Sequence, residues 1–548
     1  MSVSTRATAR QALARAEATG ARFVALGPRT AARTSELARA ADWGLGRRPA
    51  RAMAWRDLPT LTERAGEIDA RRHLRAGAPL LLVGSAGRVV GVVDAERVAP
   101  APAESSVLGR LERMADASSR ARLWLLRAAG EIGEGLGLPV YAVGGFVRDL
   151  LLGTVPGAGL PDVGLPDVDL VVEGDGIAFA RRLAEEIGGT LLVHRDFGTA
   201  SIEAGHAPGS AGLRGPSLGR VDVASARRET YRAAGALPEV TPAPLEEDLR
   251  RRDFSVNAMA VALVPARFGL LLDPLGGERD LRARRLRSLR PLAFVEDPTR
   301  IIRAARYAAR LGLRPDRATL QGIRLALDCG PYPALSGQRL WREIELTAAE
   351  PRARTAFELL VRWDMPTILN IKRRIHLRLA EVERLARWAR AAGVAVDPAE
   401  LFLLALLIGQ PAMVIVRALE RLALGGLATG FVEAAALAGP LARRVARPRL
   451  RPSAIDGLLR PVPAPALLGA WLRAGARGRR RIQWFLARGR AVRPALSGGE
   501  LLALGVPRGP RVGATLERLR RLRLDGGLAS LAEERELVKE WLTSGKEA

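Results

Sequence analysis

The spacing of apolar residues changes along the chain from short β-like runs to helical periodicity. Residues 80–94 (LLLVGSAGRVVGVVD) read as two strands around a glycine turn. Farther along, the pattern predicts a helix at 122–136, a strand at 139–143, a glycine turn that opens another helix, and a strand at 168–172. Alternation of helices and strands is typical of an α/β domain.

Beyond about residue 264 the pattern becomes helical. A strongly amphipathic helix is expected to begin near Glu296. Residues 351–548 are rich in Arg, Ala and Leu at helical spacing, with Pro/Gly breaks at 439–453 and 461–465. The predicted fold class is therefore multidomain, with α/β parts followed by an all-α part.

The longest apolar stretch, residues 401–416, spans about 16 residues and is interrupted by Gln410-Pro411, so it is short for a membrane span. A buried helix followed by a second helix fits this stretch better. Charges interrupt the first 20 or so residues, unlike the apolar core of a secretory signal. We therefore expect a soluble, cytoplasmic protein that does not associate with a membrane.

Composition and net charge indicate the class of binding partner. The 548 residues predict three or four domains at roughly 150 residues each. With 48% hydrophobic and 26% charged residues, the chain is not of the disordered class. Lys and Arg number 85 against 58 Asp and Glu, a net charge of +27. Such an excess favours a polyanionic partner, with nucleic acid ahead of an anionic membrane.

Cysteine and histidine usage limits the metal chemistry. Cys329 is the single cysteine, which excludes intrachain disulfides and a multi-cysteine zinc site. The four histidines are scattered along the chain. Any metal should therefore bind to carboxylates, which favours a hard ion such as Mg²⁺.

A glycine pair after the strand at 139–143 is the first candidate binding element. Gly144 and Gly145 allow the backbone to approach a ligand closely, and the helix that follows points N–H groups at an anion. Arg148 adds a positive charge, and Asp149 follows it. Such a turn also occurs for purely structural reasons.

Three carboxylates are candidates for catalysis. Asp167 and Asp169 are two residues apart on a strand, so their side chains face the same way. Their repulsion is costly unless a cation lies between them, which is the arrangement used in nucleotidyl transfer. Asp222, on a short strand at 220–224, is a candidate third carboxylate. The alternative for each is a solvated position on a strand.

An arginine run at 248–258 (DLRRRDFSVNA) is a candidate triphosphate site. Forked guanidinium donors such as that of Arg252 suit phosphate oxygens. Asp253 and Asn257 lie in the same run and are included among the nucleotide-binding candidates. A solvated, charged helix face is the alternative.

The segment that begins at Glu296-Asp297-Pro298 opens a helix with a basic stripe. Arg300, Arg303 and Arg306 recur at a spacing of three and share one face. Asp297 can accept a hydrogen bond from the exocyclic amine of cytosine or adenine, and Arg300 can donate to the adjacent ring atoms. Guanine and uracil present the opposite pattern. Ordinary helix initiation would also explain the Asp-Pro step.

In this order, the motifs closely resemble the class II tRNA nucleotidyltransferase/poly(A) polymerase family. The resemblance is strong over about 120–330, and residues 496–526 resemble the tail of bacterial CCA-adding members. The stretches that carry it are YAVGGFVRDLLLG (141–153), LPDVDLVVEGDG (165–176), FGTASI (197–202), RVDVASARRETY (220–231), DLRRRDFSVNAMA (248–260), DPLGGERDL (273–281) and EDPTRIIRAARYAARLGL (296–313).

The resemblance implies a domain order. The head at 118–263 would have a polymerase-β-like nucleotidyltransferase fold, and a neck at 264–350 would carry the base-reading helix. A helical body and tail at 351–548 would bind tRNA. The region 1–117 would be a partly degenerate CBS-like region, because 50–94 resembles a CBS unit and 17–49 resembles the truncated back half of another.

The resemblance also implies an activity and the roles of residues. The enzyme would add CMP and AMP from CTP and ATP to the tRNA 3′ end without a template. Asp167 and Asp169 would hold Mg²⁺; Gly145, Arg148 and Asp149 would lie by the triphosphate and sugar. Arg252 would contact the nucleotide, and the base edge would be read by Asp297 and Arg300, with Arg303 and Arg306 alongside.

The sequence departs from the family pattern through an insertion at 154–164 and a Gly/Pro/Ser-rich stretch at 204–220. Four alternatives remain: an enzyme that adds only CC, one that adds only A, a poly(A) polymerase, and a non-catalytic RNA-binding protein with a relic head. The sequence sets neither the oligomeric state nor whether the CBS-like region binds an adenine nucleotide.

Overall fold

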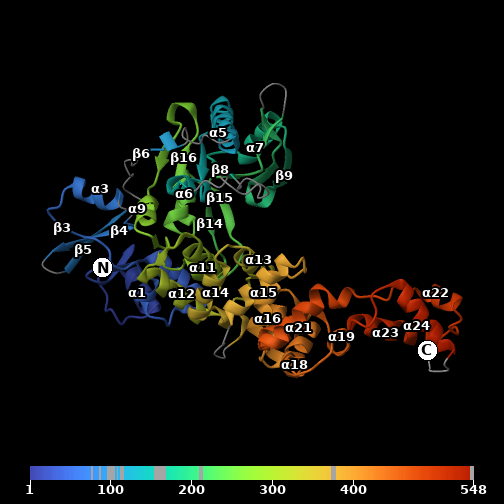
Figure 1. The fold of residues 1–548 in the computed structure, drawn as a ribbon. Coiled ribbons are helices and arrows are strands. Elements are labelled where there is room, and N and C mark those ends of the chain that lie inside the picture. The colour runs from blue at the N-terminus through green and yellow to red at the C-terminus, as the bar shows by residue number, and fades with distance from the viewer. Residues whose placement is uncertain are drawn as a thin grey trace. The chain divides into compact units, whose positions relative to one another are not determined.

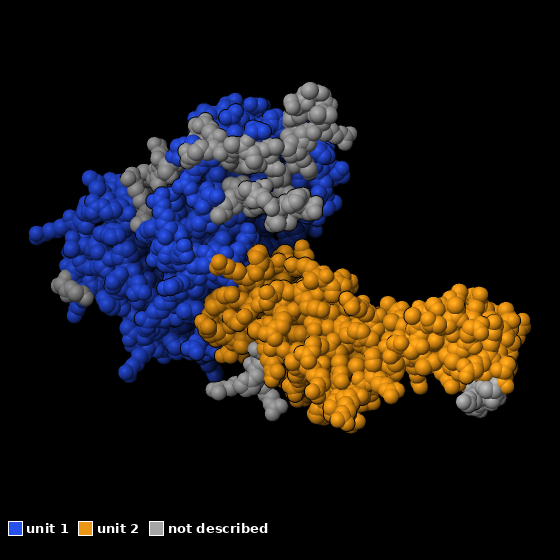
Figure 2. Space-filling view, viewed as in Figure 1, with its two compact units in different colours: residues 1–335 blue, residues 336–548 orange. Residues whose placement is uncertain are grey.

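The computed structural model of the chain describes residues 1–75, 78–85, 88–95, 105–107, 109–110, 117–153, 168–208, 214–371 and 378–543 (Figure 1). The described residues exclude the insertion at 154–164 and Asp167. The chain divides into two compact units, Met1–Leu335 and Ser336–Ala548 (Figure 2).

The first unit begins with two successive groups of elements: helix, strand, strand, helix, and then strand, helix, strand, strand. In the first group an isolated bridge joins Ser2 to Ala25 in parallel. In the second group the expected strand pair in 80–94 is confirmed. The elements are α1 (Ala9–Ala18), β1 (Phe23–Gly27), β2 (Thr30–Arg33), α2 (Thr34–Ala40), β3 (Thr60–Thr62), α3 (Glu67–Arg75), β4 (Leu80–Ser85) and β5 (Arg88–Asp94).

An eight-stranded sheet forms the centre of the first unit, in the order β6-β17-β16-β7-β8-β13-β10-β9. The strands predicted at 139–143 and 168–172 are confirmed as β7 and β8. Within this sheet β8 and β13 pair in parallel. The strands are β6 (Ser105–Ser106), β7 (Val140–Val143), β8 (Val168–Val172), β9 (Thr190–His194), β10 (Thr199–Glu203), β13 (Arg220–Ser225), β16 (Ala260–Ala262) and β17 (Leu270–Leu272).

Helices cover one face of this sheet. The buried residues of α5 (Ala117–Gly135), α6 (Gly145–Leu152) and α7 (Gly176–Ile187) join Val168, Leu170, Val221 and Val223 in one apolar core. A Cβ on Gly130 would lie 1.9 Å from the carbonyl oxygen of Leu263, so α5 reaches this packing distance only with glycine there.

A second apolar core lies on the opposite face of the sheet. This core joins Tyr141, Val143 and Val171 to Leu245 and Leu249. After β13 the first unit also includes, outside the sheet, β14 (Arg227–Thr230), β15 (Glu239–Pro242), α8 (Leu245–Arg251), the short 3-10 helix η4 (Ser255–Asn257), α9 (Gly277–Arg282), β18 (Arg285–Leu286), α10 (Ala293–Glu296), α11 (Thr299–Leu311), β19 (Arg314–Pro315) and α12 (Arg317–Cys329).

The helix expected near Glu296 is present as α10 and α11, which meet at Asp297-Pro298. Apolar side chains of α11, including Ile301 and Ala304, are fully buried. Phe254 packs edge-on against Tyr307 of α11, with ring centroids 6.0 Å apart. This contact fastens the segment before η4 to the basic helix.

The second unit is helical in its described residues, as expected. One apolar core surrounds Trp471, and another, near the C-terminus, surrounds Trp541. The helices are α13 (Gly337–Ala348), α14 (Ala353–Arg362), α15 (Leu379–Ala391), α16 (Pro398–Leu407), α17 (Ala412–Arg421), α18 (Ala428–Val445), α19 (Pro452–Leu459), α20 (Ala464–Arg473), α21 (Ala476–Ala487), α22 (Gly498–Ala503), α23 (Pro510–Leu524) and α24 (Leu531–Thr543).

The apolar stretch 401–416 forms parts of α16 and α17, as expected. Among the described residues, one helical stretch, Gly425–Val445, has the length and hydropathy of a membrane span. Core helices of soluble proteins share these properties, and Phe431, Ala438 and Val445 of this helix are buried. The stretch alone therefore does not indicate a membrane.

Candidate active site

Two of the three candidate carboxylates lie on adjacent parallel strands. Asp169 of β8 is the register partner of Asp222 of β13, so both side chains face away from the helix-covered core. Asp222 Oδ1 accepts hydrogen bonds from Ser201 Oγ at 2.5 Å and Arg220 Nε at 3.0 Å. The described residues include no cluster of three metal-ligating side chains. Asp167 lies outside them, immediately before β8.

The glycine turn meets one of these carboxylates and a candidate arginine. Gly144 has φ 69° and ψ −129°, a conformation that favours glycine, and α6 begins at the next residue. A Cβ on Gly144 would lie 3.3 Å from both Asp169 Oδ2 and Arg252 Nη1. A carboxylate, a guanidinium and an open backbone therefore converge at one point of the sheet.

Several other nucleotide-binding candidates form one buried hydrogen-bond network. Arg148, which is 3% exposed, donates to Asp149 Oδ1 at 2.8 Å and to Asn257 Oδ1 at 2.8 Å. Asn257 Nδ2 in turn donates to Asp253 Oδ1 at 3.1 Å. The structure brings these candidates together, although they bond to one another and join α6 to η4.

The network extends to α11 through Arg303. Its Nε donates to Asp253 Oδ2 at 2.8 Å. Burial would raise the pKa of Asp253, but Arg303 and Arg300 lower it below its usual value. Asp253 is therefore a carboxylate that stays ionised and fixes the basic helix against η4.

Tyr307 collects three guanidinium groups around its ring, and the sequence did not single it out. The guanidinium carbons of Arg148, Arg303 and Arg306 lie 5.4, 5.5 and 5.1 Å from the ring centroid. Such distances are within cation–π range. Two of these cations are also paired with carboxylates, Arg148 with Asp149 and Arg303 with Asp253.

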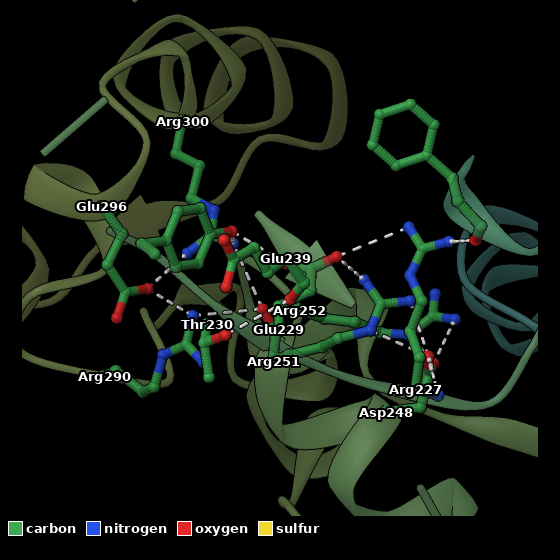
Figure 3. Close-up of polar contacts among 12 residues, drawn as sticks. Arg227, Glu229, Thr230, Glu239, Asp248, Arg251, Arg252, Arg290, Glu296 and Arg300 are labelled. Carbon is green, nitrogen blue, oxygen red and sulfur yellow. Dashed lines mark hydrogen bonds and ion pairs between the residues drawn. The ribbon is translucent and has the colours of Figure 1, made fainter. Parts of the chain in front are cut away.

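Arg252 is held by a second network (Figure 3). The fully buried Asp248 accepts from Arg252 Nη2 at 3.0 Å and from Arg251 Nη2 at 2.6 Å. Burial would raise the pKa of Asp248, but the two arginines lower it below its usual value. Asp248 thus fixes the direction of Arg252 toward the glycine turn.

The same network continues to the candidate base-reading residue. Arg251 Nη1 donates to Glu229 Oε1 at 2.6 Å, and Tyr231 Oη donates to Glu229 Oε2 at 2.8 Å. Arg300 Nη2 lies 3.4 Å from Tyr231 Oη. Glu229 and Tyr231 lie on and just after β14, and sequence reasoning missed both because their partners are far away along the chain.

Arg300 and Asp297 are both engaged within the protein. Arg300 is 7% exposed and donates to the carbonyl oxygens of Ala293 at 3.2 Å and Arg251 at 3.2 Å. Asp297 Oδ1 accepts from the backbone N–H and the hydroxyl of Thr299 at 3.1 and 2.7 Å. Contact of the Arg300 Nη atoms with a base would require exchange of their hydrogen bonds.

Glu296 is a further residue to which the sequence analysis assigned no role in the site. It is fully buried and pairs with Arg39 at 2.8 Å, Arg290 at 2.5 Å and Arg300 at 3.4 Å. Arg39 comes from α2, so the N-terminal region contacts the carboxylate that holds Arg300. Figure 3 shows Glu296 between Arg290 and Arg300.

Comparison with known proteins identifies the family to which the chain is similar. A family model described as the poly(A) polymerase head domain matches residues 140–287. An A-adding tRNA nucleotidyltransferase of Geobacter sulfurreducens is 34% identical over 426 residues, which cover 75% of this chain and 46% of the relative. A CC-adding tRNA nucleotidyltransferase of Deinococcus radiodurans is 33% identical over 427 residues, 78% of this chain and 95% of the relative.

Coverage of the A-adding relatives is partial, because the chain spans about half of their length or less. Among solved structures, an apo CCA-adding enzyme aligns with a TM-score of 0.67 and 28% identity, over 80% of this chain and 99% of that one. The Thermotoga maritima CCA-adding enzyme complexed with tRNA aligns with a TM-score of 0.63 and 27% identity, over 80% and 99%. Given these matches across the head and helical regions alike, the chain belongs to the tRNA nucleotidyltransferase family of enzymes.

Proposed function

We propose that this protein adds CMP and AMP from CTP and ATP to the 3′ end of tRNA, without a nucleic-acid template, to complete the CCA sequence. The observation that carries the proposal is the convergence of Gly144, Asp169 and Arg252 within 3.3 Å of one point. Relatives named for CC, A and CCA addition support the same reaction class.

Mg²⁺ is the metal that this site suits. Asp169 and Asp222 offer carboxylate oxygens on one face of the sheet, which are the ligands that a hard divalent ion prefers. Asp167 and Asp169 would hold the ion, with Asp222 as a candidate third carboxylate. When bound, the ion lowers the pKa of the attacking hydroxyl and neutralises charge on the leaving group.

The chain's own groups would bind and orient the nucleotide. The backbone of Gly144 and Gly145 lets the triphosphate approach the N-terminus of α6, where Arg148 and Asp149 would lie near the triphosphate and sugar. Arg252, held by Asp248, would contact the phosphates. The RNA 3′-hydroxyl then attacks the α-phosphorus, the bond to the β-phosphate oxygen breaks, and pyrophosphate leaves.

Selection of the base would fall to α11. Asp297 would accept from the exocyclic amine that cytosine and adenine share, and Arg300 would donate to the adjacent ring atoms. Arg303 and Arg306 would lie alongside. For this the Arg300 hydrogen bonds to Tyr231 and to the carbonyl oxygens must be exchanged for bonds to the base, so selection is coupled to a local rearrangement.

Partial addition is the second candidate. The A-adding relative is 34% identical over 75% of this chain, and the CC-adding relative is 33% identical over 78%. Either activity uses the same two-metal chemistry and the same carboxylates. Poly(A) synthesis is a further alternative, supported by the description of the matching head family.

The test uses three tRNA transcripts that lack the last three, the last two or the last nucleotide, with labelled CTP and ATP offered separately and together. Addition of three nucleotides that then stops would identify a CCA-adding enzyme. Two cytidines, or one adenosine alone, would identify a partial enzyme, and a long adenosine tail would identify a poly(A) polymerase.

Asp169→Asn should lower incorporation on every transcript by about 10³-fold, because it removes a charged metal ligand. Glu185→Gln is the matched control: this carboxylate is exposed on α7, which covers the other face of the sheet. Equal activity of Asp169→Asn and the wild type would show that the carboxylate pair is not the reaction centre.

A further inference from the structure

A cavity of about 400 Å³ lies where the N-terminal region meets the helices that follow the head, and it is separate from the glycine turn. Trp55, Arg56 and His73 line it from the N-terminal side. Arg279 and Arg317 line it from the other side, and all lining residues belong to Met1–Leu335. Its volume is within the range of about 300–1,000 Å³ typical of small-molecule sites.

The lining of the cavity is strongly cationic. Arg56, Arg279, Arg285, Arg287, Arg290 and Arg317 face it, against two carboxylates, Asp57 and Asp316. Three of the arginines have carboxylate partners: Arg285 and Arg287 share the buried Asp280, and Arg290 pairs with Glu296. Within the described part of the chain, no acidic side chain lies within ion-pair distance of Arg56, Arg279 or Arg317.

The arginines of the cavity wall repel one another. Burial lowers the pKa of Arg56, and its neighbours Arg51 and Arg317 lower it further. Burial also lowers the pKa of Arg279, where Arg285 and Arg287 oppose the effect of Asp280. Both groups remain charged at neutral pH, so an anion that enters the cavity relieves the repulsion.

The cavity wall also contains an aromatic side chain beside the arginines. Trp55 lies in the wall, with the Arg33 guanidinium 5.1 Å from its ring centroid. The Nε1 of Trp55 is buried and has no hydrogen-bond partner within the described residues. His73 of α3 and Gln321 of α12 add polar edges. A ring system with exocyclic polar groups matches such a wall.

We propose that this cavity binds a free nucleotide, whose phosphates contact Arg56, Arg279 and Arg317 and whose base lies against Trp55 and His73. Guanidinium groups bind phosphate oxygens through paired donors, and aromatic faces bind bases by stacking. The ligand class is a nucleoside phosphate, and the site is distinct from the one beside Asp169.

A short series of ion pairs connects the cavity to the candidate base-reading residue Arg300. Arg290 lines the cavity and donates to Glu296, and Glu296 also pairs with Arg300. The cavity wall is therefore joined through one buried carboxylate to Arg300. The connection to base reading rests on the proposed function, which assigns that role to Arg300.

The binding test is equilibrium dialysis of the full chain against labelled ATP. The wild type should bind two ATP molecules, one in the head and one in the cavity. The triple variant Arg56→Ala, Arg279→Ala, Arg317→Ala should bind one with unchanged affinity, and the affinity of the second site should fall by about tenfold or more. Arg252→Ala should lose the head site and retain the cavity site.

The control is Arg64→Ala, Arg72→Ala, Arg182→Ala, which removes the same charge from exposed positions outside the cavity. The single variant Arg317→Glu, at an exposed position, repeats the test with minimal risk to folding. It should also weaken the second ATP, and normal binding of two ATP molecules by this variant and the triple variant would overturn the proposal.

The outcomes separate the two sites. A wild type that binds one ATP, lost in Arg252→Ala, would overturn the cavity site and leave the proposed function standing. A second ATP lost in the cavity variants, with no site lost in Arg252→Ala, would support the cavity and count against the head assignment. Weaker tRNA binding by the triple variant, with both ATP sites intact, would assign these arginines to RNA and overturn the nucleotide proposal.

Discussion

The two units of the molecule use arginine in different ways. In the first, fully buried carboxylates such as Asp248, Asp280 and Glu296 each accept two or three arginines. In the second, many ion pairs join neighbouring turns of one exposed helix, as in Arg354–Glu358 and Arg521–Glu517. The same residue type therefore fixes side chains in place in one unit and leaves charge on the surface of the other.

The difference shows where charged side chains are held in fixed positions and where they contribute mainly to the electrostatic field around the protein. A buried pair is fixed in direction, and breaking it leaves an uncompensated charge. An exposed pair is screened by water and salt and contributes little. The second unit also contains fully buried carboxylates, Asp456 and Glu534. Asp456 accepts from Arg460 and Arg520, which joins α19 to α23, and Glu534 pairs with Arg523.

The largest expected effect in this comparison comes from Asp248→Asn. The substitution leaves Arg251 and Arg252 partly buried without their carboxylate, which should destabilise the protein by about 3–5 kcal/mol. Arg252 should also lose its direction toward Gly144, so KM for the nucleotide should rise. Thermal unfolding and steady-state kinetics measure the two effects.

The matched control in the second unit is Glu358→Gln, which breaks the exposed pair with Arg354. Its Tm should equal that of the wild type within error. If both substitutions lowered Tm equally, the contrast between the two units would be wrong.

A smaller effect is expected from Arg477→Ala with Arg480→Ala in α21. These two side chains are exposed, whereas Arg479 and Arg481 of the same helix are bonded to Glu381 and to backbone carbonyls. The double variant should bind tRNA more weakly, and the slope of log K against log salt should decrease by about 1–2. ATP binding should stay unchanged, and unchanged tRNA affinity would place the phosphate contacts elsewhere.

The smallest expected effect is that of Glu36→Gln. Burial raises the pKa of Glu36, Arg39 opposes this, and the neighbouring Glu296 adds to it. A folded-state pKa above the unfolded value means that the ionised form costs stability at high pH, and the cost disappears as pH falls through the folded pKa to the unfolded one. The variant should therefore raise Tm by about 1–3 °C at pH 8 and by less at pH 4.5.

A Tm difference that grows as the solution is acidified would contradict the sign of this shift. Arg39→Gln, at the same contact, should change Tm in the opposite direction. It removes a partner of the buried Glu296 and should lower Tm at pH 8.

The sequence predicted the local parts of this structure well. The strands β7 and β8 and the helix that begins after Asp297-Pro298 follow from short patterns of apolar and capping residues. The convergence of Gly144 with Asp169 follows from a strand and a turn that are adjacent in the sheet. The roles of these residues, and Asp167 itself, stay predictions.

Long-range contacts could not be predicted in the same way. Arg39 and Glu296 are 257 residues apart, and neither lies in a recognisable pattern with the other. Asp222 was a candidate from its strand alone, and its place opposite Asp169 depends on a register that no local pattern encodes. The hydrogen bonds that hold Arg300 come from Tyr231 and from the backbone of Arg251, which local periodicity does not reveal.

The order of strands in the eight-stranded sheet has a consequence for synthesis on the ribosome. β6 at Ser105–Ser106 pairs with β17 at Leu270–Leu272, and the segment between the parallel strands β8 and β13 includes α7 and the sheet strands β9 and β10. The sheet cannot close until β17 has left the exit tunnel, about 10–30 s after β6 at typical translation rates. Helices of Ser336–Ala548 form mainly from local contacts and fold soon after they emerge. A nascent head with open strand edges is therefore the stage at which this protein most needs a chaperone.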